Sequence, residues 1–160
     1  MNIQTTRRPQ AQTHQTRVPA QEEQKPQDPW HLKTADYLER SNDVMTPKLA
    51  AIGLAAKFAM KGNQFTESLH PVAKAVGIVG GGLVGGFLGH TGGGLLQSLN
   101  SSATDTVFGQ DTSLLKSVVS VGFNSAAFGL VGGWTGAALH GIATAGGAAQ
   151  LARQDIINQG

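Results

Sequence analysis

The pattern of hydrophobic and polar positions divides the chain into three parts. Residues 1–28 are rich in Gln, Thr, Pro and Arg, and they hold too few apolar groups to offset the entropy lost on ordering. Residues 29–74 mix apolar and charged positions at helical spacing, and residues 75–152 are mostly apolar. The pattern predicts an all-α chain with a disordered N-terminal tail, one or two short amphipathic helices and a hairpin of two hydrophobic helices.

Two helices are expected within residues 29–74. Pro29 suits the start of a short helix that reaches Met45. Thr46 followed by Pro47 is typical of an N-cap and the first position of a second helix, and Gly62 suits the left-handed residue that ends one.

Four lysines precede the long apolar part of the chain, and we interpret them as basic residues at a membrane surface: Lys48, Lys57, Lys61 and Lys74. Lysines on the polar side of an amphipathic helix favour an anionic lipid surface. The alternative is the solvated face of an ordinary helix.

Two segments lack any Asp, Glu, Lys or Arg: 30 residues lie between Lys74 and Asp105, and 36 between Lys116 and Arg153. About 20 apolar residues suffice for a helix to cross the hydrocarbon core. We therefore predict helices at about 75–98 and 114–152, joined by a polar loop at 99–113. The lysines before the first segment place both termini on the cytoplasmic side by the positive-inside rule.

Each apolar segment carries small residues at every fourth position. Residues four apart lie on nearly the same face of a helix, and in lipid such a face allows close packing of helices. These are the predicted helix-packing positions: Gly77, Gly81, Gly85, Gly89 and Gly93 in the first segment, and Gly129, Gly133, Ala137 and Gly141 in the second.

These rows resemble glycine-zipper membrane proteins. The resemblance covers residues 76–149 and concerns spacing and composition. It implies that the helices associate within a membrane, with each other or with copies of the chain, and it implies no particular activity.

The composition narrows the classes of partner. Charged residues make up 14% of the chain, against about 25% in soluble domains. A net charge of +2 without a dense basic stripe argues against nucleic acid. The absence of cysteine excludes disulfides and cysteine nucleophiles.

The N-terminal region lacks the apolar run of a conventional signal peptide. Its basic composition, with no acid before Glu22, resembles type III secretion leaders and, less well, mitochondrial presequences. The alternative is a solvated tail that carries no address. Secretion without a conventional signal peptide is therefore one expectation for this chain.

His90 and His140 are the titratable groups within the apolar segments. Ionisable residues inside a membrane are candidates for pH sensing, and the alternative is a neutral histidine that forms a hydrogen bond between helices. Two histidines without a carboxylate give no metal site, and no catalytic set can be assembled from the sequence. We expect no enzyme activity, no cofactor and no small-molecule substrate.

A GxGxxG motif occupies residues 80–85, and Asp105 follows it. The motif is similar to the turn that binds the pyrophosphate of dinucleotides. A dinucleotide-binding fragment is therefore one functional hypothesis. The main hypothesis is a membrane protein that self-associates through its glycine faces and permeabilises or remodels a membrane, or acts as a secreted effector. The alternative is a soluble helical module that packs those faces on a partner.

Overall fold

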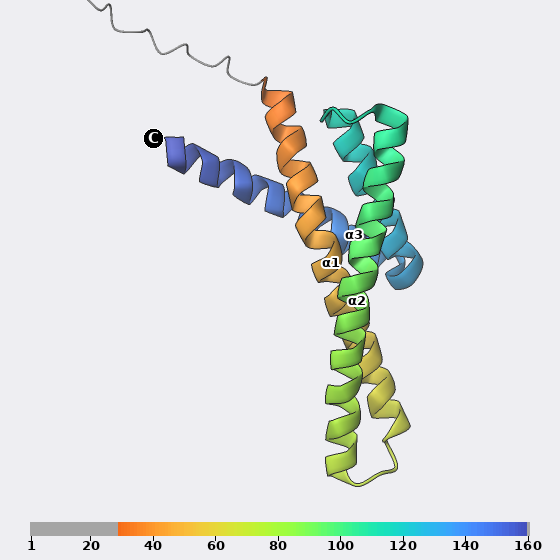
Figure 1. The fold of residues 1–160 in the computed structure, drawn as a ribbon. Helices are drawn as coiled ribbons and strands as arrows, with labels where there is room; N and C mark the ends of the chain where they lie inside the picture. Colours follow the sequence, from red (N-terminus) through yellow and green to blue (C-terminus); the bar gives the residue numbers. More distant parts are fainter. Residues whose placement is uncertain (1–28, 160) are drawn as a thin grey trace, which may run out of the picture.

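The computed structural model describes residues 29–159, which form three long helices and no strand (Figure 1). The helices are α1 (Trp30–Phe65), α2 (Pro71–Phe108) and α3 (Leu114–Gln159). The predicted all-α class is confirmed. The predicted tail at 1–28 lies outside the described residues.

Helix α1 is a single helix of 36 residues with Pro47 in its interior. The expected helix start at Thr46 is wrong, because the Thr46 side chain is buried and pairs with Asn42 and His140 instead of capping a new helix. Gly62 does not end the helix, which continues to Phe65. Packing therefore outweighs the local end signals in this segment.

Helices α1 and α2 form a long antiparallel hairpin, with the turn between them at one end of the molecule (Figure 1). Pro71 is the first residue of α2, where its missing N–H costs nothing, and the side chain of His70 accepts a hydrogen bond from the Val72 N–H at 3.4 Å. The two apolar segments, in α2 and α3, also contact each other through Asn100 and Ser120, but the more extensive contact of α2 is with α1.

The connection from α2 to α3 is shorter than the predicted loop at 99–113. Helix α2 runs to Phe108, and Gly109 takes a positive φ of 84° that favours glycine. Ser113 Oγ then accepts a hydrogen bond from the Lys116 N–H at 3.2 Å. The Lys116 ammonium pairs with Asp105 and holds the two helix ends together.

Helix α3 bends sharply at Gly133, whose φ of 64° and ψ of −162° are not helical. The bend folds the second half of α3 back across α1, and the described end of the chain points away from the hairpin (Figure 1). The second apolar segment is therefore two helical arms joined at an elbow.

The start of α1, the 109–113 connection and the end of α3 lie at the same end of the molecule. Thr112 Oγ1 donates to Glu39 Oε2 at 3.4 Å, and Tyr37 Oη donates to Asp155 Oδ2 at 2.7 Å. The opposite end carries the turn between Phe65 and Pro71 (Figure 1).

Candidate functional site

The buried interior of the described residues is polar. Only Ala35 and Ala148 are buried hydrophobic residues there. The other buried side chains form what we call the polar core: Ser41, Asn42 and Thr46 from α1, Gln97, Asn100 and Thr104 from α2, and Lys116, Ser117, Ser120, Asn124, His140 and Thr144 from α3. This is the reverse of a water-soluble domain, whose interior is apolar.

Asn124 lies at the centre of the polar core. Its Nδ2 lies 3.2 Å from Asn42 Oδ1, 3.0 Å from Thr46 Oγ1 and within hydrogen-bond distance of Gln97 Oε1. Asn100 Nδ2 donates to Ser120 Oγ at 2.8 Å, and Asn42 Nδ2 donates to the same oxygen at 3.1 Å. The network therefore joins all three helices, and buried polar groups need such partners.

His140 is fully buried in the polar core. Its Nε2 lies 2.9 Å from Thr46 Oγ1 on α1, and its Nδ1 lies 3.0 Å from Ser125 Oγ across the α3 elbow. The ring stacks on Phe128 with 4.7 Å between ring centres. His140 thus takes part in an interhelical hydrogen bond, whereas His90 is exposed on α2, so the two histidines do not act together.

The glycine row of α2 lies against the backbone of α1. A Cβ added at Gly85 would lie 2.7 Å from the Leu54 carbonyl carbon, and one added at Gly89 would lie 2.6 Å from that of Ala50. Gly81 and Gly93 approach α1 as closely, and Gly77 meets Gly62 and Thr66. Side chains larger than hydrogen do not fit at these positions without a shift of the helices.

The second row does not form one helix face, because the bend at Gly133 interrupts it. A Cβ at Gly129 would lie 3.3 Å from Ala137 Cβ, although residues eight apart on a straight helix are about 12 Å apart. Gly141 lies near Ser125 in the same way. This row packs the two arms of α3 against each other.

The four predicted surface lysines fall into two groups. Lys57, Lys61 and Lys74 lie towards the α1–α2 turn, where Gly62 meets Gly77. Lys48 is farther from the turn, beside Pro47, which packs on Gly93. The Lys57 ammonium also donates to the Val131 carbonyl oxygen at 2.7 Å, so it holds the elbow of α3 against α1.

Many large apolar side chains lie on the outer surface. Large hydrophobic side chains are exposed along all three helices, and Leu130 and Trp134 at the elbow are 92% and 93% exposed. Helices α2 and α3 are long and apolar enough to cross a membrane by length and composition. The described residues therefore combine a polar interior with large apolar side chains on the outside.

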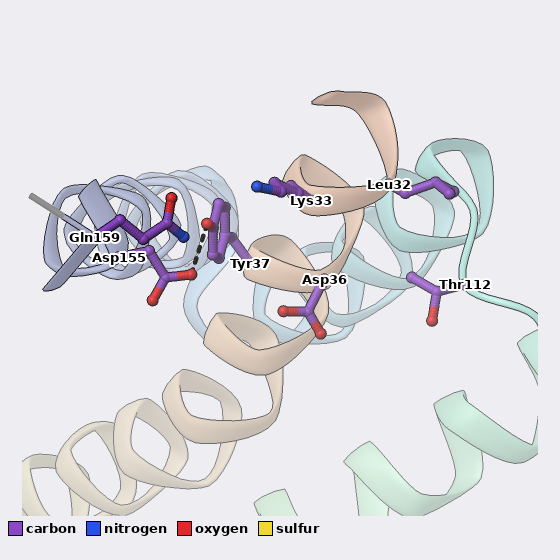
Figure 2. Close-up of a pocket in the computed structure, with 7 residues that line it drawn as sticks. All are labelled: Leu32, Lys33, Asp36, Tyr37, Thr112, Asp155 and Gln159. Atoms are coloured by element: carbon purple, nitrogen blue, oxygen red, sulfur yellow. Dashed lines mark hydrogen bonds between the residues drawn. The ribbon is translucent and has the colours of Figure 1, made fainter. Parts of the chain in front are cut away.

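A shallow hollow lies where α1, the 109–113 connection and α3 meet (Figure 2). Tyr37 lines this hollow, and the hydrogen bond that it donates to Asp155 raises the pKa of the Tyr37 hydroxyl above its usual value. On the same helix, partial desolvation raises the pKa of the Asp43 carboxyl, against the lowering effect of its hydrogen bond from Gln97. The Tyr37–Asp155 hydrogen bond joins the end of α3 to α1 and the Gln97–Asp43 hydrogen bond joins α2 to α1. No cluster of metal-ligating side chains occurs among residues 29–159.

The GxGxxG motif at 80–85 lies entirely inside α2. A dinucleotide site needs a strand before the glycines and a helix that starts beside them, and the described residues contain no strand. The dinucleotide hypothesis is therefore wrong, and Gly81 and Gly85 serve the contact with α1.

Sequence reasoning missed the composition of the polar core. Asn124 lies in an apolar segment and is expected to bond between helices, but its partner Asn42 is 82 positions away and by itself resembles a polar residue on a helix surface. The available signal is the set of Asn, Gln, Ser and Thr residues inside or beside segments without charge. Such residues have to find partners in an apolar environment.

The chain was compared with family models, with curated proteins and with solved structures, and no match was found in any of the three.

Proposed function

We propose that this chain is a membrane-inserted helical protein that acts on the membrane itself, by permeabilising or remodelling it. The observation that carries the proposal is the distribution of side chains, with a hydrogen-bonded polar interior and large hydrophobic side chains exposed along the helices. In water, burial of apolar area is the dominant force for folding, and here Ala35 and Ala148 are the only buried hydrophobic residues among residues 29–159. In lipid, close packing of small residues and hydrogen bonds between helices take that role.

Helix α2, with α1 packed along its glycine row, is the part that we assign to the crossing of the bilayer. The charge-free stretch of α2 between Lys74 and Asp105 corresponds to about 45 Å of helix, against a hydrocarbon core of about 30 Å. The bent α3 enters from one side and returns to it, because both of its ends lie beside the start of α1.

Self-association is the second part of the proposal, and it has to use the outer surface. Helix α1 covers the main glycine row of α2, so that row is closed to a second copy while the hairpin is intact. The exposed apolar side chains of α2 and of the α3 elbow offer the contacts for an oligomer in lipid. Crosslinking in membranes at increasing protein-to-lipid ratio tests this part.

Flotation with lipid vesicles, followed by alkaline carbonate extraction, tests insertion. We expect the protein to float with the vesicles and to resist carbonate. Recovery as a monodisperse soluble species would overturn the proposal and favour the soluble interaction module. Release of a trapped dye from the same vesicles measures permeabilisation.

A further inference from the structure

An apolar groove runs along the hairpin between α1 and α2, near the turn that joins them. Phe58, Phe65 and Met60 supply exposed hydrophobic side chains on the α1 side, and Val84 supplies one on α2. Gly80 lines the groove at an open position, since no atom lies within 4 Å of an added Cβ there. The remaining lining residues are Lys57, Lys61, Gly62, Gln64 and Gly81.

Two lysines one helical turn apart stand at the rim of this groove. Lys57 and Lys61 are both exposed, and no lining residue is acidic. Neither lysine takes part in an ion pair among residues 29–159. Lys57 uses one of its three N–H donors on the Val131 carbonyl, so the rim keeps donors and positive charge for an anion.

The position of the lysines suits the headgroup region of a bilayer. Lys61 lies one turn before α1 ends at Phe65, and the turn beyond it carries the polar residues Glu67 and His70. Lysines near a helix end extend their ammonium groups to the membrane interface while their stems cover apolar surface. An apolar groove below a cationic rim matches one molecule with a charged head and an apolar tail.

We propose that this groove binds a single anionic phospholipid, with one acyl chain along Gly80 and Val84 and the phosphate between Lys57 and Lys61. The proposal rests on the membrane insertion proposed above. It adds a defined lipid site to a surface that otherwise contacts lipid without selectivity.

The test measures phospholipid retained by the full chain, purified in mild detergent with phosphatidylglycerol or phosphatidylcholine, by native mass spectrometry. We expect one phosphatidylglycerol to be retained and phosphatidylcholine to be lost. Lys61→Gln should weaken retention about fivefold, the effect of one lysine charge near an anionic surface. Arg153→Gln removes an exposed cation of α3 outside the groove and should leave retention unchanged.

A second pair of variants tests the acyl-chain part of the groove. Gly80→Leu places a side chain in the groove, whereas Gly94→Leu places the same side chain at an equally open position of α2 outside the groove. Retention should fall for Gly80→Leu alone. Equal retention of both lipids, or the same result for both leucine variants, would overturn the lipid site.

The outcomes separate the two proposals. If the unmodified chain fails to float with vesicles of either lipid, the proposed membrane insertion fails and the lipid site with it. If the chain floats with both lipids and the variants have no effect on retention, insertion stands and the lipid site is wrong. Displacement of the retained lipid by millimolar inorganic phosphate alone would mean that the rim binds phosphate without the groove.

Discussion

At the scale of single residues, the glycines of α2 differ by what faces them. Gly85 packs on the α1 backbone, whereas Gly92, on the same helix, has no atom within 4 Å of an added Cβ. Both are glycines within a helix, where alanine is favoured intrinsically by about 1 kcal/mol. The two positions therefore separate helix propensity from helix contact.

We expect Gly85→Ala to destabilise the hairpin and Gly92→Ala to stabilise it. The Cβ at position 85 would lie 2.8 Å from Phe58 Cβ and 2.7 Å from the Leu54 carbonyl carbon, and overpacking of this kind typically costs about 1 to 3 kcal/mol. Gly92→Ala gains up to about 1 kcal/mol in propensity. Thermal unfolding in detergent, followed by circular dichroism, measures both. Shifts of the same sign would mean that α1 does not contact this row.

Asn124 is the residue on which the polar core most depends. We expect Asn124→Leu to lower the stability of the fold by about 1 to 3 kcal/mol, because Asn42, Thr46 and Gln97 lose a shared donor and stay buried. Thr91→Val is the matched control, since Thr91 is exposed and bonds only to carbonyls of its own helix. Resistance to proteolysis in detergent reports the difference. An Asn124→Leu chain as resistant as the control would contradict a role for the network in stability.

At the scale of the elements, α3 is the helix whose shape the sequence predicts least well. Its glycine spacing predicts a straight face, but the backbone leaves the helical region at Gly133. The contacts that stabilise the bend come from residues far apart in the chain: Lys57 bonds the Val131 carbonyl, and His140 bonds Ser125 and Thr46. The bend therefore depends on tertiary contacts that no local pattern reveals.

We expect Gly133→Ala to shift α3 towards a straight helix. The φ and ψ of Gly133 lie in a region that is essentially confined to glycine, so alanine there costs about 1 to 3 kcal/mol. Gly132→Ala is the control, because its added Cβ meets nothing within 4 Å and its φ is ordinary. Spin labels at positions 115 and 158 report the change, since a straight helix would place them about 65 Å apart. An unchanged distance in Gly133→Ala would show that the elbow does not need glycine.

At the scale of the whole molecule, the sequence predicts the composition of the helices better than their partners. The all-α class, the start of α3 at Leu114 and the long apolar helices follow from periodicity and missing charge. The pairing of α2 with α1 does not follow, because α1 offers small residues such as Ala50 at the contact and the α3 row offers a similar surface. Spacing alone does not choose between two suitable partners.

The arrangement of the chain ends gives a prediction of topology. Single cysteines at positions 110 and 158 should be labelled by an impermeant reagent from one side of the membrane, and a cysteine at Ser68 from the other. The reason is that Thr112 and Asp155 bond to the first part of α1, whereas Ser68 lies in the turn at the far end of the hairpin. The chain has no cysteine of its own, so each variant reports one site. Labelling of positions 110 and 158 from opposite sides would mean that α3 crosses the membrane.

The hairpin has a consequence for the order in which the molecule is assembled during synthesis. Contacts between α1 and α2 begin beside the turn, where Gly62 meets Gly77, and extend residue by residue to Pro47 and Gly93, so each new pair closes only a small additional loop. Contacts of α3 with α1 join residues 82 and 103 positions apart, as in Ser117 with Ala35 and Ser41 with Thr144. The hairpin can therefore form progressively from its turn as soon as Phe108 has left the ribosome. Until α3 is made, Asn42, Thr46 and Gln97 bond only to one another across the hairpin, and the docking of α3 brings them their shared partner Asn124.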